Sequence, residues 1–225
     1  MGYIRWLGHA SFEIKLKEKV VLIDPWISGN PVAPIKLEEL TAPDVVLVTH
    51  YHGDHYADAT KICRKFNATL VSIYEIAQHA AREGISKTVG MNIGGVANVE
   101  GLEIVMTPAL HSSEIGSPVG YIVTEENTSI YHAGDTGLFY DIKLYAELYP
   151  IDIALVPIGG YFTMDSRQAA KFISLFSPKV TIPMHYNTFP AIRQDPKKFE
   201  EYVKQYSPAT KVVILKPGEK WEISL

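Results

Sequence analysis

VVLVTHYHGDHYAD, residues 45–58, is the most informative stretch of this sequence. It begins with an uninterrupted apolar, mostly β-branched run, and such a run bounded by polar turn residues is typical of a strand buried on both faces. Four residues of metal-binding type follow at once: His50, His52, Asp54 and His55. Open α/β sheets carry their functional sites on such loops, at the carboxyl ends of interior strands. We therefore expect a metal site here.

The spacing of these residues indicates two ions rather than one. His50 and His52 are two residues apart in an extended or turning segment, so both imidazoles project the same way and can reach one ion. Asp54 and His55 come after a glycine, which tolerates a sharp turn, and are aimed at a second ion. Two ions about 3.5–4 Å apart can hold a hydroxide and polarise an ester, lactone or phosphoester oxygen. The alternative is a helix cap by Asp54 or His55, which accounts poorly for three histidines and an aspartate at fixed offsets.

His50-x-His52-x-Asp54-His55 resembles the signature of the metallo-β-lactamase fold superfamily, a set of mostly dinuclear metal hydrolases. The opening stretch Gly8-His9-Ala10-Ser11-Phe12 is similar to one branch of it, the small metal-dependent hydrolases of the UPF0173 type related to L-ascorbate 6-phosphate lactonase. The resemblance spans nearly the whole chain. It implies a four-layer αββα sandwich, an α/β and α+β arrangement with two sheets face to face and metals at the edge where the halves meet. Periodicity alone supports only one layered domain of helices and strands.

The remaining metal ligands are implied by this resemblance. The family takes its third ligand of the first metal from a loop after a later strand, where this chain has His111. Its bridging motif, Gly-Asp-Thr, stands here as Gly134-Asp135-Thr136, and one carboxylate with two oxygens can bridge two ions. His185 follows another apolar strand. The expected ligands are His50, His52 and His111 for the first metal, and Asp54, His55 and His185 for the second, with Asp135 as the bridge.

Three residues have expected roles beside the metals. Asp54 is expected to orient the nucleophile or pass its proton to the leaving group. His9, between small residues, reads as a turn residue by itself, and the resemblance implies a substrate-binding or acid/base residue. Asp24 ends an apolar strand, so burying it requires a partner. It is either the supporting residue that the family places beside the His motif or a turn Asp before Pro25.

Two divalent metal ions are the expected cofactors. Nitrogen and carboxylate ligands suit Zn²⁺, our first choice, and also Mn²⁺, Fe²⁺ or Ni²⁺. A water on zinc has its pKa lowered to about 7, which makes hydroxide available at neutral pH.

The composition sets limits on class and compartment. With 225 residues, 47% hydrophobic and 20% charged, we expect one domain, residues 1–225, made of two β-rich halves near 1–98 and 99–225. A net charge of -4 argues against binding nucleic acid by phosphate neutralisation. The single cysteine, Cys63, fits a reducing compartment. Because the sequence shows no secretion signal and no apolar run long enough to span a membrane, we expect a cytoplasmic protein. We expect its partner to be a small-molecule substrate. Association into a homo-oligomer is possible.

The pattern along the chain predicts elements that can be checked. Short β-type runs predict that the chain opens as an antiparallel meander. The long loop 27–41 can form a wall of a substrate pocket. Asp165 together with Gln168 predicts a capping box at the start of a helix. In the loop before it, Tyr161, Phe162 and Met164 either line a pocket or pack on their own helix. The predicted strands include 3–7, 11–17 and 20–23, with a closing hairpin of 212–215 and 221–223; the predicted helices cover 56–66, 74–82 and 166–176, and a last one starts at Asp195.

Three functions compete on these observations. The first is a hydrolase for a small ester, lactone or phosphoester. The second is a phosphodiesterase or nuclease of the RNA-processing branch, against which the acidic charge balance counts. The third is a non-catalytic metal-binding protein with a closed site. The presence of all seven expected ligands favours an enzyme.

Overall fold

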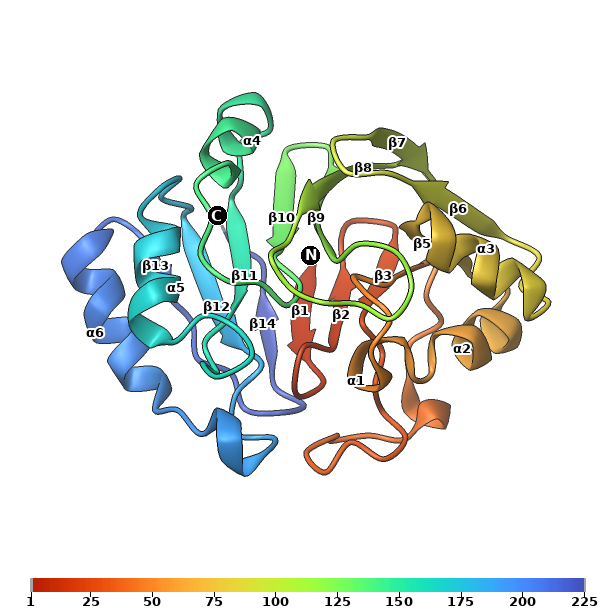
Figure 1. Cartoon of the computed structure of the whole chain (residues 1–225), viewed down its shortest axis with the longest axis horizontal. Helices are drawn as coiled ribbons and strands as arrows, with labels where there is room; N and C mark the ends of the chain where they lie inside the picture. The colour runs from red at the N-terminus through yellow and green to blue at the C-terminus, as the bar shows by residue number, and fades with distance from the viewer. Residues whose placement is uncertain (1, 225) are drawn as a thin grey trace.

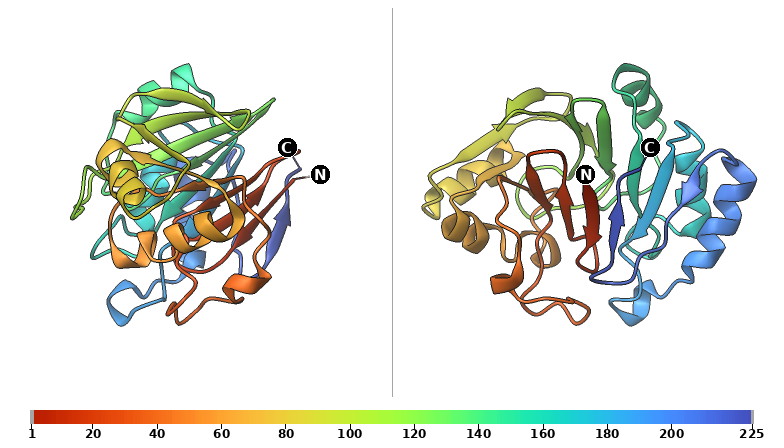
Figure 2. Two further views of the ribbon diagram at one scale, coloured as in Figure 1. Left: turned by 90° about the vertical axis from the view of Figure 1, so that its right-hand side faces the viewer. Right: turned by 180° about the vertical axis from the view of Figure 1, so that it is seen from behind.

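A computed structural model describes residues 2–224 as two seven-stranded mixed sheets packed face to face, with helices outside both (Figures 1 and 2). Helices α1 to α3 lie on one side of the sheet pair and α5 and α6 on the other (Figure 1). The layers follow from the pattern of apolar faces, because each sheet buries one face against the other sheet and one against helices. The expected αββα sandwich is confirmed.

The first sheet has the strand order β14-β1-β2-β3-β4-β5-β6. Its first four strands are antiparallel neighbours, and β3 to β6 are parallel. The predicted opening meander is confirmed in β1, β2 and β3. The strands are β1 (Tyr3–Trp6), β2 (Phe12–Lys15), β3 (Val20–Ile23), β4 (Val45–Leu47), β5 (Thr69–Ile73), β6 (Thr88–Met91) and β14 (Lys220–Glu222).

The second sheet has the order β13-β12-β11-β10-β9-β8-β7. Strands β7 to β10 are antiparallel, and β10 to β13 are parallel. The strands are β7 (Val96–Val99), β8 (Leu102–Pro108), β9 (Val119–Glu125), β10 (Thr128–His132), β11 (Ile153–Pro157), β12 (Val180–Met184) and β13 (Lys211–Val212).

The helices begin where the sequence supplies caps. Asp165 accepts a hydrogen bond from the Gln168 backbone N–H, and the Gln168 side chain accepts from the Asp165 N–H, as the capping box predicts. The α-helices are α1 (Gly53–Tyr56), α2 (Ala59–Phe66), α3 (Tyr74–Arg82), α4 (Ile142–Leu148), α5 (Ser166–Ile173) and α6 (Pro196–Tyr206); short 3₁₀ turns cover Leu37–Glu39 and Pro190–Ile192.

Strand direction brings distant loops to one edge. In the first sheet β1, β3 and β4 run the same way, and in the second β8, β10 and β12 share one direction. Each of these six strands therefore ends at the same edge of its sheet, and each expected site residue follows one of them. Residues 2–224 contain no helix long and apolar enough to cross a membrane.

Two predicted elements differ from the structure. The helix expected over 56–66 is present as α2 but starts only at Ala59, and a separate turn, α1, precedes it and contains Asp54 and His55. The expected closing hairpin does not form, because β13 pairs with β12 while β14 pairs with β1. The chain crosses from one sheet to the other between these strands, so each covers the edge of a different sheet. The turn residues at 217–218 indicated that the chain changes direction there, but they did not indicate which strand β14 would pair with.

Candidate metal centre

Three histidines form the first group of possible ligands. His50 follows β4, His52 precedes α1, and His111 follows β8, so the group joins the two sheets. Their ligand atoms all lie within 4.8 Å of one another. The His50 Nε2 and His52 Nδ1 atoms are 2.9 Å apart. Nitrogens on a tetrahedral zinc ion lie roughly 3.3 Å apart at Zn–N bonds of about 2.0–2.1 Å, so this spacing is close to that of a shared cation.

A second group lies beside the first. It consists of His9, Asp54, His55 and His185, whose ligand atoms again lie within 4.8 Å of one another. The first turn of α1 places Asp54 and His55 side by side, and the loop after β12 brings His185 from the other sheet. The structure thus brings these residues together, and His9 lies inside the group.

Asp135 lies between the two groups. Its Oδ2 atom is 3.5 Å from His111 Nε2 in the first group. The same oxygen is 3.5 Å from His55 Nε2 and 3.0 Å from His185 Nε2 in the second group. One carboxylate oxygen therefore contacts ligands of both groups.

The donor set fits divalent cations. Among residues 2–224, the buried atoms His55 Nε2 and Asp135 Oδ1 have no hydrogen-bond partner, although buried polar groups nearly always have one. The His50 Nε2 and His52 Nδ1 atoms at 2.9 Å either share one hydrogen in an N–H···N bond or direct both lone pairs at a cation. Cations bound by both groups would satisfy all of these atoms.

Asp24 fixes the orientation of two of the histidines. Its Oδ2 atom accepts a hydrogen bond from His55 Nδ1 at 2.8 Å and another from the Thr49 hydroxyl at 2.6 Å. Because the Thr49 proton is used there, His50 Nδ1, 3.0 Å from Thr49 Oγ1, donates to that oxygen. Both rings therefore use Nδ1 as a donor and turn Nε2 towards the site, and Nε2 is the nitrogen that each would offer to a metal.

The pKa values follow from burial and neighbouring charge. Burial, together with nearby His55, lowers the pKa of His50 to about 2, so this imidazole is neutral and able to bind a metal. Burial alone would raise the pKa of Asp24, but His55 outweighs it and holds that pKa below its usual value. Burial opposes the charged form of His55, yet Asp135 and Asp24 outweigh it and raise its pKa. Asp24 is thus charged at neutral pH.

His9 is fully buried and contacts Asp54, another member of the second group. Its Nε2 is 3.1 Å from Asp54 Oδ2, and its Nδ1 is 2.9 Å from Thr188 Oγ1. Burial lowers the pKa of His9 to about 4, against the opposing effect of Asp54. His9 is accordingly a neutral imidazole, which accepts from Thr188 and donates to Asp54.

Backbone contacts join the ligand loops of the two sheets. The His9 carbonyl accepts a hydrogen bond from the His185 N–H at 2.9 Å. His132 Nε2 donates to the Ala10 carbonyl at 2.9 Å, and His132 Nδ1 accepts from the Gly134 N–H at 3.1 Å. Gly134 has φ +61°, and a Cβ there would lie 2.5 Å from the Val119 carbonyl, so only glycine fits.

Thr49, Thr188 and the two contacts of His132 were not identified from the sequence. A polar residue closing the apolar run 45–48 was a usable signal for Thr49. Thr188 had no such signal, because its contact with His9 joins positions 179 residues apart.

Comparison with known proteins agrees with this geometry. The β-lactamase superfamily domain matches residues 3–185. The chain belongs to this superfamily. It is 53% identical over 221 residues to a UPF0173 metal-dependent hydrolase of Caldivirga maquilingensis, covering 97% of each chain. A UPF0173 metal-dependent hydrolase of Methanopyrus kandleri is also 53% identical, with 97% of this chain and 99% of that protein covered.

A solved structure supports the same membership. It is a metallo hydrolase from the hyperthermophilic archaeon Ignicoccus hospitalis, 40% identical, with a TM-score of 0.92 and 99% of each chain covered. The resemblance seen in the His motif is confirmed, and the protein is a metal-dependent hydrolase of the metallo-β-lactamase fold.

Proposed function

We propose that this protein is a dinuclear hydrolase that cleaves a small ester, lactone or phosphoester. The observation that carries the proposal is the place of Asp135 Oδ2, which contacts His111 of one group and His55 and His185 of the other. A carboxylate shared by two ligand groups is the arrangement that a pair of cations needs.

His50, His52 and His111 would hold one cation, and Asp54, His55 and His185 the other. Zinc is the first choice, and manganese, iron or nickel accept the same nitrogen and carboxylate donors. When bound, such a pair supplies an activated water at neutral pH and polarises the substrate oxygen.

The chain's own residues would orient and move protons. The Asp54 side chain is 27% exposed, whereas that of Asp135 is only 3% exposed. Asp54 is therefore the carboxylate that faces incoming water and substrate, and it would orient the nucleophile or pass its proton to the leaving oxygen. His9, bonded to Asp54 Oδ2 and held by Thr188, would fix that carboxylate in place.

Metal analysis with a substrate panel tests the proposal. His111→Ala and His185→Ala should each reduce bound metal from two ions per chain towards one and reduce hydrolysis of the lactone or ester. His79→Ala is the control, because that side chain bonds Tyr51 and lies outside both groups of ligand atoms. Unchanged metal content in the first two variants would contradict the proposal.

The same panel separates the other two functions. Cleavage of bis(4-nitrophenyl) phosphate and binding of RNA, without action on esters or lactones, would favour a phosphodiesterase or nuclease. Two bound ions with no hydrolysis of any substrate would favour a non-catalytic metal-binding protein.

A further inference from the structure

We propose that Trp26 and Phe189 form a subsite beside the metal centre that binds a flat unsaturated ring of the substrate. The proposal rests on the hydrolase function above and names the chemical class of the substrate's non-reacting part. Trp26 lies in the loop after β3 and Phe189 in the loop after β12, so the two residues come from different sheets. Their rings stack with centroids 5.8 Å apart and planes inclined by 28°.

Both rings contact the residue that holds Asp54. The Trp26 ring lies 5.2 Å from the His9 ring at 85°, and the Phe189 ring lies 5.5 Å from it at 71°. His9 Nε2 in turn bonds Asp54 Oδ2. A ligand ring on this pair would therefore lie directly beside the reacting groups.

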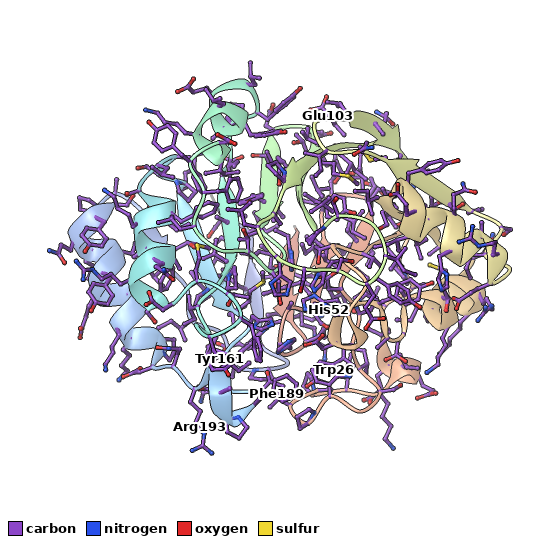
Figure 3. All side chains as sticks on the ribbon, viewed as in Figure 1. Trp26, His52, Glu103, Tyr161, Phe189 and Arg193 are labelled. Atoms are coloured by element: carbon purple, nitrogen blue, oxygen red, sulfur yellow. The ribbon has the colours of Figure 1, made fainter. Side chains whose placement is uncertain are left out.

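Exposure separates this pair from ordinary core packing. His9 beneath is 0% exposed, whereas Phe189 is 36% exposed and Trp26 is partly exposed. Figure 3 shows Trp26 and Phe189 next to each other on the same edge of the molecule, below His52. Aromatic faces that meet solvent at the mouth of a polar site are available to a ligand.

A second pair of aromatic side chains lies along the same edge. Tyr161 and Phe162 are 84% and 53% exposed, and their rings meet edge to face at 4.7 Å. Gln194 Nε2 donates to the Gly159 carbonyl at 3.4 Å, which ties the loop of Tyr161 to the loop of Phe189, and Figure 3 labels both residues. The two exposed aromatic pairs thus lie on loops that contact each other.

Aromatic faces discriminate between rings of similar size. A flat aromatic ring pairs with Trp26 and Phe189 through offset or edge-to-face contacts between ring quadrupoles, and a saturated ring has no such quadrupole. One such contact corresponds to about a 2- to 10-fold gain in affinity beyond apolar burial. A pocket that was merely apolar would instead bind the saturated ring at least as well.

Matched substrates test the subsite. Methyl phenylacetate and methyl cyclohexylacetate share the scissile bond and leaving group and differ in the flatness of one ring. We expect kcat/KM to be about 2- to 10-fold higher for the phenyl ester. Trp26→Leu and Phe189→Leu keep an apolar side chain without a ring, and each should remove the preference. Tyr140→Leu, a 62% exposed aromatic residue next to α4, should keep it.

A binding measurement separates failure of the subsite from failure of the hydrolase proposal. Titration calorimetry with phenylacetate and cyclohexylacetate reports the ring preference without turnover, in both the metal-loaded and the metal-free protein. Hydrolysis of both esters with no phenyl preference, and equal binding of the two acids, would overturn the subsite while leaving the hydrolase standing. Preferential phenylacetate binding that persists in both Leu variants would also overturn it.

Discussion

Asp24 determines the state of the ligand histidines although it belongs to neither proposed ligand set. Its carboxylate binds His55 directly and His50 through Thr49, so it controls which nitrogen of each ring is free. The sequence predicted that a buried aspartate would need a partner, because an unpaired buried charge is costly. The resemblance implied that Asp24 supports the His motif, and Asp24 does bind His55 of that motif. Its bond with the Thr49 hydroxyl was not predicted.

We predict that Asp24→Asn lowers metal affinity by about 10- to 100-fold, because the amide no longer holds the His55 proton as a carboxylate does. Competition against a chelator of known affinity measures this. Asp141→Asn, at an exposed aspartate before α4, serves as the control and should leave affinity unchanged. An affinity unaltered by Asp24→Asn would show that this residue does not orient the ligands.

At the scale of elements, the helices and strands with strong local signals were predicted well. The helix over 74–82 matches α3, and Asp195 with Pro196 starts α6 as expected. The predictions differed from the structure where contacts between distant parts of the chain decide where a helix starts or which strands pair. The first turn of α1 forms inside the His motif, and β14 pairs with β1 from the other end of the chain. Neither outcome has a signal within its own residues.

The loop after β3 is attached to the start of α2 through Asp58. Its buried Oδ2 atom accepts hydrogen bonds from the backbone N–H groups of Ile27 at 3.0 Å and Ser28 at 2.7 Å. These bonds fix the loop that carries Trp26. Burial raises the pKa of Asp58, but the Ser28 and Ile27 bonds outweigh it and hold that pKa below its usual value.

We predict that Asp58→Ala lowers the free energy of unfolding by about 2–3 kcal/mol at pH 7, because two charge-assisted bonds are lost. A depressed carboxylate pKa contributes stability above the unfolded value of about 3.9, and this stability disappears as pH falls through the folded pKa. The difference between variant and wild type should therefore shrink at acidic pH. Urea denaturation at pH 7 and at pH 3 measures it. A difference independent of pH would assign the effect to packing instead.

At the scale of the whole molecule, the site lies where the ligand loops of the two sheets meet. Ligands from the first half meet ligands from the second, and the backbone of His9 binds the backbone of His185. The resemblance predicted this meeting, and the common direction of the strands that end at the site explains it. The His132–Ala10 contact, which links the two halves, could not be predicted, because it joins residues 122 positions apart.

His132 variants test that link between the halves. His132→Asn can still accept from Gly134 N–H but cannot reach the Ala10 carbonyl, and His132→Phe loses both contacts. We predict a cost of about 1–3 kcal/mol for each buried backbone group left unpaired, so the Phe variant should be the less stable in urea. Both variants lose the Ala10 contact, so a wild-type stability in either would mean that this contact does not hold the two halves together.

Metal removal should lower the stability of the protein, because the ions would connect ligands from both halves. We predict that chelation lowers the melting temperature and that added Zn²⁺ restores it. Binding at about 1,000 times the dissociation constant stabilises a folded protein by about 4 kcal/mol per site. Calorimetry with and without chelator measures the change, and a melting temperature insensitive to both treatments would contradict a metal held between the halves.

The most direct test is a crystal structure of the zinc-loaded protein with anomalous scattering recorded at the zinc edge. We predict two peaks about 3.5–4 Å apart. One should lie among His50, His52 and His111, the other beside His55 and His185, with Asp135 contacting both. A single peak, or two peaks of which only one touches Asp135, would contradict the dinuclear centre.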